Sequence, residues 1–154
     1  MKNQELIEKF YQSFVDGNAE GMIMCYHDDI EFEDPAFGKL KGDKAKAMWQ
    51  MLLSRKDASP QIQFSGVKAN EKTGSATWIA EYEYGKQKRK VINHISAKFE
   101  FADGKIIRHT DDFDLWKWSR QALGFSGLLL GWSSFMRNKI QATTNGLLRK
   151  YMEK

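Results

Sequence analysis

Cysteine and proline are scarce in this sequence, with one cysteine and two prolines in 154 residues. A single thiol, Cys25, cannot form an internal disulfide, which is typical of a protein kept in a reducing compartment. The few prolines, and the absence of repeats and low-complexity tracts, give no sign of a linker. The first residues, MKNQELIEKF, are amphipathic and do not resemble a secretory signal. We therefore expect one cytoplasmic domain with a single core.

Long hydrophobic runs and a basic body are also missing. The longest uncharged run, Gln121–Met136, is 16 residues long and contains glycines, so it is too short to span a bilayer. Residues 137–154 hold five basic residues against one acidic residue, which accounts for the whole net charge of +4. Residues 1–136 are balanced, with 19 basic and 19 acidic side chains. This pattern argues against a nucleic-acid partner, which would need a basic stripe on the body.

The periodicity of apolar residues changes once along the chain. Apolar residues at helical spacing predict a helix over 4–16, a short helix from Asn18 to about residue 26, and a helix over 44–55 capped by Asp43. The stretch IEFED alternates as a strand does. After Pro60 the period becomes two, and turn residues separate the predicted strands, which cover 61–69, 75–84, 89–101 and 105–114. Helices followed by a meander predict an α+β fold, a curved antiparallel sheet with helices on one face.

Strand parity predicts which polar side chains point inward. In HDDIEFEDPAFG, Asp34 continues the series of Ile30 and Phe32, so it is the one acid of five that faces the interior. The same sorting turns three other polar side chains inward: Asn93, His109 and Asp111. Most inward positions on the last three strands are apolar or aromatic: Trp78, Ala80, Tyr82, Tyr84, Val91, Ile95, Ala97, Phe99, Phe101, Ile107 and Phe113.

Three ionisable side chains in one apolar interior point to a functional site, because buried charges are costly unless they are paired. A structural interpretation is also open. His109 and Asp111 can be a satisfied pair, and Asp34, which precedes Pro35, can accept backbone hydrogen bonds in a turn.

The order of these elements, and the strings YHDD and FEDP, resemble the nuclear transport factor 2-like superfamily, in particular ketosteroid isomerases and SnoaL-like polyketide cyclases. The resemblance covers residues 4–118. It implies a cone whose helices close over a curved sheet around a deep apolar pocket, and it implies a homodimer. Residues 119–154 would then be an apolar segment and a helix that pack on the cone domain of residues 1–118.

The resemblance also implies roles for individual residues. Asp34 matches the isomerase general base, but the positions of the two oxyanion donors hold Phe10 and Ala97, which cannot donate. Tyr11 lies about 100° further round the helix. Losing one such donor costs on the order of a hundredfold in rate, which argues against steroid isomerisation.

The string RHTDDFD resembles the end of SnoaL-like proteins, where the first acid of D-x-F-D lines the pocket and acts as acid–base. That acid is Asp111 here, with His109 one inward step away. The catalytic set implied is Asp34, His109 and Asp111, with no cofactor. The residues expected to bind substrate are Phe10, Trp78, Tyr82, Tyr84, Asn93, Ala97, Phe99 and Phe113.

Two functions stay open. The first is proton transfer on a small apolar carbonyl compound, as in isomerisation or aldol-type cyclisation. The second is a non-catalytic module that binds a hydrophobic molecule or serves as a dimerisation scaffold. Epoxide hydrolysis would need an arginine between two acids, and Arg108 faces outward. A metal site would need a second inward histidine beside His109, so we expect none.

The C-terminal segment ends in a predicted helix over 134–152. Its apolar stripe, Met136, Ile140, Thr143, Leu147 and Tyr151, predicts packing over the pocket mouth or across a dimer. Its few basic residues make a membrane-surface helix the weaker alternative.

Overall fold

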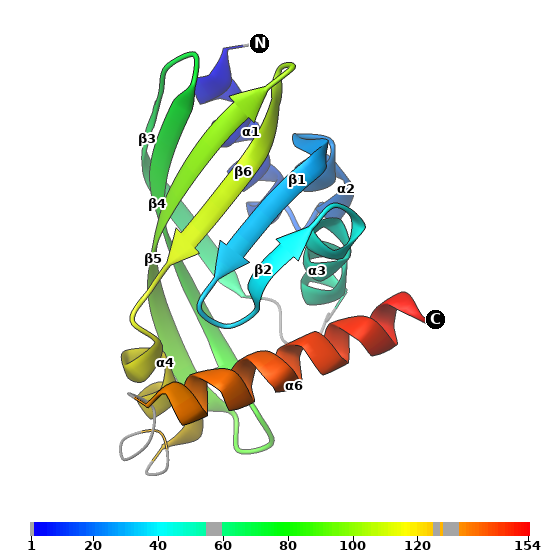
Figure 1. Cartoon of the computed structure of the whole chain (residues 1–154). Helices are drawn as coiled ribbons and strands as arrows, with labels where there is room; N and C mark the ends of the chain where they lie inside the picture. Colours follow the sequence, from blue (N-terminus) through cyan, green and yellow to red (C-terminus); the bar gives the residue numbers. More distant parts are fainter. Residues whose placement is uncertain (1, 55–59, 125–126, 128–132) are drawn as a thin grey trace.

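The chain folds as an α+β domain in which helices pack on one face of a six-stranded sheet, as the sequence predicts (Figure 1). The structure, a computed structural model, describes residues 2–54, 60–124, 127 and 133–154. The helices are α1 (Asn3–Val15), α2 (Ala19–Ile23), α3 (Asp43–Leu53), α4 (Leu115–Leu123) and α6 (Ser134–Met152). The strands are β1 (Tyr26–Asp34), β2 (Gly38–Lys41), β3 (Gln61–Ala69), β4 (Thr73–Tyr84), β5 (Arg89–Ala102) and β6 (Lys105–Asp112).

The sequence predicts two helix N-caps, Asn18 and Asp43, and the structure confirms the first of them. Asn18 begins α2, because its side chain accepts a hydrogen bond from the Gly21 N–H at 3.0 Å. The helix ends at Ile23, earlier than predicted, since β1 follows at once. The prediction that Asp43 caps α3 is wrong: Asp43 is the first helical residue, and Gly42 occupies the cap with a positive φ of 56°.

The strand order is β2-β1-β6-β5-β4-β3. The predicted meander of β3 to β6 is confirmed, but β1 lies parallel to β6, so the sheet is mostly rather than wholly antiparallel. Sequence analysis missed β2, which has four residues and one buried side chain, Leu40, too few to show a period. The predicted strand IEFED also begins too late, at Ile30, because His27, Asp28 and Asp29 already lie within β1.

The predicted alternation of inward and outward side chains agrees with the structure except at the start of β6. Along β5, alternate residues from Val91 to Phe99 are buried, as predicted. On β6, however, Ile106 is fully buried and Ile107 only half-buried. The cause is a shift of the β5–β6 register between Glu100 and Phe101. From His109 onward the predicted parity is correct.

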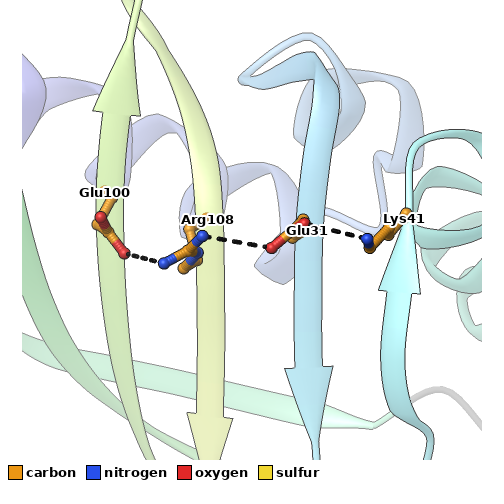
Figure 2. Close-up of polar contacts among 4 residues, drawn as sticks. All are labelled: Glu31, Lys41, Glu100 and Arg108. Atoms are coloured by element: carbon orange, nitrogen blue, oxygen red, sulfur yellow. Dashed lines mark hydrogen bonds and ion pairs between the residues drawn. The ribbon is translucent and has the colours of Figure 1, made fainter.

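The outer face of the sheet is polar and faces water. One row of side chains crosses four strands as alternating charges, Glu100, Arg108, Glu31 and Lys41 (Figure 2). Arg108 lies 3.1 Å from a Glu100 oxygen and 3.4 Å from a Glu31 oxygen, and Lys41 lies 3.4 Å from the other Glu31 oxygen. The charges of this row are therefore paired across four neighbouring strands.

Two sets of helices close the inner face. In Figure 1, α1 to α3 lie behind the sheet, and α6 crosses its lower end past the β1–β2 turn. The bounds of α6 confirm the prediction, and Met136 and Ile140 are buried, but Thr143 and Leu147 are exposed and Leu148 is buried in place of Leu147. No helix in the described ranges is long and apolar enough to cross a membrane. The run 125–132 lies outside the described residues except for Gly127.

Candidate functional site

A chain of hydrogen bonds crosses the interior with His109 at its centre. His109 on β6 is 0% exposed. Its Nε2 lies 2.8 Å from Oδ1 of Asp111, and its Nδ1 lies 2.7 Å from the hydroxyl of Tyr26. The Trp49 indole N–H donates to the Tyr26 oxygen at 2.9 Å, and the Trp78 indole N–H reaches Asp111 Oδ1 at 3.4 Å. Five side chains from β1, α3, β4 and β6 thus form one network.

The direction of this network follows from the two ends. An indole N–H can only donate, so Tyr26 must accept from Trp49. The arrangement that gives every donor an acceptor then has the Tyr26 O–H donating to His109 Nδ1 and the His109 Nε2–H donating to Asp111.

Aromatic rings surround His109 on the inner face. Strand pairing places Phe32 and Phe99 directly beside it, and their ring centroids lie 5.1 and 4.5 Å from the imidazole. Phe10 from α1 meets it edge-on at 5.4 Å, and Trp49 stacks at 6.3 Å. This packing encloses the imidazole, which has no exposed surface of its own.

Asp111 keeps one oxygen available. It pairs across the sheet with Ala97, which itself pairs with Ala76, so small side chains flank the carboxylate. Both hydrogen bonds to Asp111 go to Oδ1, and no described residue donates to Oδ2. The residue is 3% exposed. Asp111 is therefore anchored through one oxygen and free at the other.

Asp34, at the end of β1, has a similar division between its oxygens. Its Oδ1 accepts from the N–H groups of Ala36 and Phe37 at 3.0 and 2.6 Å, which is the turn role that the sequence left open. No described residue bonds to Oδ2. Burial raises the pKa of Asp34 to about 7, and the charges of Asp111 and Glu33 add to the rise, while the two N–H groups oppose it. Asp34 therefore titrates near neutrality.

The end of the interior near Asp34 is lined by half-buried aromatic residues. The hydroxyl of Tyr82 accepts from the indole N–H of Trp118 at 2.7 Å, and the ring of Tyr84 meets Trp118 edge-on at 5.2 Å. Burial, and in smaller part the charge of Asp34, raise the pKa of Tyr82. We use the name mouth for this set of residues alone: Asp34, Tyr82, Tyr84, Asn93 and Phe113. Its aromatic members pack against an apolar cluster that includes residues of α4 and α6.

Asn93 is a polar side chain of the mouth whose amide has no hydrogen-bond partner among the described residues. It is buried on β5, opposite Ala80. Its donors and acceptor are therefore available to a ligand.

The residues expected from sequence separate into two groups. A deep group packs around His109 and Asp111: Phe10, Trp78, Ala97 and Phe99. Asp34, Tyr82, Tyr84, Asn93 and Phe113 form the mouth. The two groups meet through the Asp111 charge, which raises the pKa of Asp34. Two surface hollows of about 580 and 660 Å³ lie elsewhere, and neither is lined by Asp34, His109 or Asp111.

Sequence reasoning did not connect three interior side chains, Tyr26, Trp49 and Tyr11, with the site. Tyr26 and Trp49 hold His109, and a tyrosine at the start of YHDD was visible but lay before the expected strand. Tyr11, set aside because of its helix angle, is fully buried and stacks on Phe64 at 5.4 Å. Its hydroxyl has no hydrogen-bond partner among the described residues. Burial, and then the charge of Asp111, raise the pKa of Tyr11.

The described residues contain no group of three or more histidine, cysteine, aspartate or glutamate side chains placed to hold a metal ion.

A cone of helices on a curved sheet, with acidic side chains inside it, is the fold of a known class of proteins. A family model of that class matches this sequence. Residues 7–109 match the SnoaL-like domain, and the chain belongs to that family. No curated protein matches the sequence. Helix α6 lies beyond the matched range.

Solved structures share the fold at low identity. A protein of Pseudomonas putida KT2440, named as a candidate polyketide cyclase, is 18% identical with a TM-score of 0.66, covering 79% of this chain and 98% of its own. An epoxide hydrolase of M. tuberculosis, described as LEH-like, is 16% identical with a TM-score of 0.65, covering 83% and 96%. A protein of Catenulispora acidiphila DSM 44928 with a ketosteroid isomerase-like fold, in complex with trimethylamine, is 11% identical with a TM-score of 0.62, covering 77% and 92%.

Proposed function

We propose that this SnoaL-like protein transfers a proton on a small apolar carbonyl compound, as an isomerase or an aldol-type cyclase does. The observation that carries the proposal is the pair of carboxylates, Asp34 and Asp111, each anchored through one oxygen and free at the other. Their surroundings differ, which is how one fold separates an acid from a base. Asp34, with a pKa of about 7, takes up and releases a proton at neutral pH.

The other groups take supporting roles in this proposal. His109 is a positioning residue, because it is enclosed and bonds only to Tyr26 and Asp111. Tyr11 and Asn93 bring donors without a described partner, and Tyr11 is a donor to the developing enolate oxygen in place of the missing one at Phe10. Phe113 and Tyr82 supply apolar contact at the mouth.

The test is exchange of α-protons in D₂O, followed by ¹H NMR with cyclohexanone and β-tetralone as probes. We expect Asp34→Asn and Asp111→Asn to lower the protein-dependent rate by about 10² or more. Asp112→Asn is the matched control, because Asp112 is the neighbouring carboxylate on β6 and is exposed. Since Asp34 acts as the base when ionised, the rate should rise with pH around a midpoint near 7. Equal rates in Asp34→Asn and Asp112→Asn would overturn the assignment.

A second candidate, binding without catalysis, is favoured by the half-buried aromatic side chains of the mouth, Tyr82, Tyr84 and Phe113. Mass spectrometry of the purified protein after denaturation would then reveal a retained apolar ligand. Retention should fall on replacement of Phe113 by Ala and stay unchanged in Asp34→Asn. The opposite pattern would favour the catalytic proposal.

The homodimer, the cytoplasmic location and the domain division after residue 118 stay predictions from sequence. Sedimentation equilibrium tests the first of them directly. A monomer at micromolar concentration would contradict it.

A further inference from the structure

The turn between β1 and β2, residues 35–37, is the starting point. Asp34 Oδ1 accepts from the N–H groups of Ala36 and Phe37, so the turn and the carboxylate fix each other's orientation. The orientation of the second Asp34 oxygen therefore depends on the conformation of the turn. Contacts that fix the turn also fix the Asp34 carboxylate.

Helix α6 supplies side-chain donors to the carbonyl groups of the same turn. The donors are spaced i, i+3 and i+4, so they share one face of the helix. The bonds run from Gln141 Nε2 to the Pro35 carbonyl at 3.0 Å, from Thr144 Oγ1 to the Ala36 carbonyl at 2.7 Å, and from Asn145 Nδ2 to the Phe37 carbonyl at 2.8 Å. The turn is thus held by Asp34 on its N–H side and by α6 on its carbonyl side.

The helix lies directly against the turn. Gly38, the next residue, has a φ of +75°, and a Cβ atom there would lie 3.2 Å from Oε1 of Gln141. A side chain at this position would be strained and would push on α6. The close approach therefore depends on glycine.

Apolar packing alone does not account for these three polar residues. Met136, Ile140 and Leu148 bury α6 on either side of them. Gln141, Thr144 and Asn145 are half-buried between these anchors, where an aliphatic side chain would also pack. Their polar groups specify one seating of the helix on the turn.

We propose that α6 is a positioning element for Asp34: Gln141, Thr144 and Asn145 hold the 35–37 turn, and through the turn they fix the orientation of the Asp34 carboxylate. This inference rests on the proposed function for its catalytic meaning. The three hydrogen bonds from α6 to the turn, which we call the clamp, do not depend on any substrate. Because α6 lies beyond the matched SnoaL-like range, the clamp is an addition made by this chain's own C-terminal residues.

The experiment replaces the three donors by apolar side chains of similar size, Gln141→Met, Thr144→Val and Asn145→Leu, in the full chain. The matched control is Thr143→Val, because the exposed Thr143 bonds only to the Lys139 carbonyl within its own helix. Thr144→Val alone is the milder variant should the triple variant fold poorly. Thr144→Ser keeps the hydroxyl and should behave as the wild type.

The readout is the titration of the Asp34 carboxyl group by ¹³C NMR. Burial is the largest cause of its raised pKa, so release of the turn into water should lower the midpoint by about one pH unit or more. With a carbonyl probe, kcat should fall at least about tenfold while KM changes less, since the base is misplaced rather than removed. The Thr143→Val variant should show neither change.

The clamp fails if the triple variant and Thr143→Val give the same Asp34 midpoint, whether or not the melting temperature has fallen. Failure of the proposed function looks different. In that case no ketone shows protein-dependent exchange, yet the Asp34 midpoint still responds to the clamp variants.

Discussion

Arg108 and His109 are neighbours on β6 that point to opposite faces of the sheet. Arg108 has a side chain that is 55% exposed and bonds to two carboxylates in the outer row (Figure 2). His109 is 0% exposed and bonds to Tyr26 and Asp111 within a cage of rings. Each residue therefore has two polar partners, and only their access to water differs.

This difference decides how much each network stabilises the fold. Water competes for exposed charges, so an outer ion pair contributes little. An interior group has no water to replace a lost partner, and its removal leaves an unsatisfied donor or acceptor. Networks of similar size on the two faces should therefore differ several-fold in their contribution to stability.

The largest effect is expected for His109→Leu. It leaves Tyr26 without its acceptor and Asp111 as a buried carboxylate without its anchor, at a cost of about 3 kcal/mol or more. Urea unfolding at neutral pH measures it. His94→Leu is the matched control, because His94 is exposed on β5. If the two variants unfold at the same urea concentration, the inner network contributes no more than an outer side chain.

The next effect concerns Asp34 and depends on pH. The pKa of Asp34 is raised from 3.8 to about 7 in the folded protein, so the folded state holds its proton more tightly than the unfolded state. Stability on this account is greatest at about pH 4 and falls as pH rises towards 7. Asp34→Asn removes that loss. Relative to the wild type, the variant should gain about 2 kcal/mol between about pH 4 and pH 6.

Urea unfolding of both proteins at the two pH values gives this double difference. Glu33→Gln is the control, because Glu33 is the adjacent exposed acid. A parallel pH dependence in wild type and Asp34→Asn would show that Asp34 titrates as an ordinary exposed acid does.

The same contrast explains what could be predicted from the sequence. Parity along β5 and β6 placed Asn93, His109 and Asp111 inside, because alternation is a local property of a strand. The error at Ile107 came from a register shift, which depends on the partner strand. The parallel pairing of β1 with β6 could not be predicted either, because no local sequence pattern specifies which strands pair.

The site shows the same limit. Asp34 was found by parity, but the clamp from α6 joins residues about a hundred positions apart and carries no local pattern. The polar spacing of Gln141, Thr144 and Asn145 was present in the sequence. Without knowing what the helix covers, it could not be told from an ordinary solvent-facing stripe.

Trp118→Phe should have an intermediate effect, because the mouth lies between the two extremes in burial. The change removes the hydrogen bond to the Tyr82 hydroxyl and keeps an aromatic ring in place. We expect a loss of about 1 kcal/mol, less than for His109→Leu, because water can reach the half-buried Tyr82. Trp116→Phe on the same helix is the control, since the contact of the Trp116 ring with the Arg120 guanidinium at 4.1 Å is separate from the Trp118–Tyr82 hydrogen bond. A larger loss in Trp116→Phe would mean that α4 is held elsewhere.

The smallest effect is expected on the outer face. Arg108→Gln removes both ion pairs of the residue, but the groups involved are solvated and screened by salt. The melting temperature should fall by less than about 2 °C at low ionic strength, and the difference should vanish in about 1 M salt. A fall as large as that of His109→Leu, unchanged by salt, would mean that the outer face is not open to water, as it would be if a second copy of the chain covered this row.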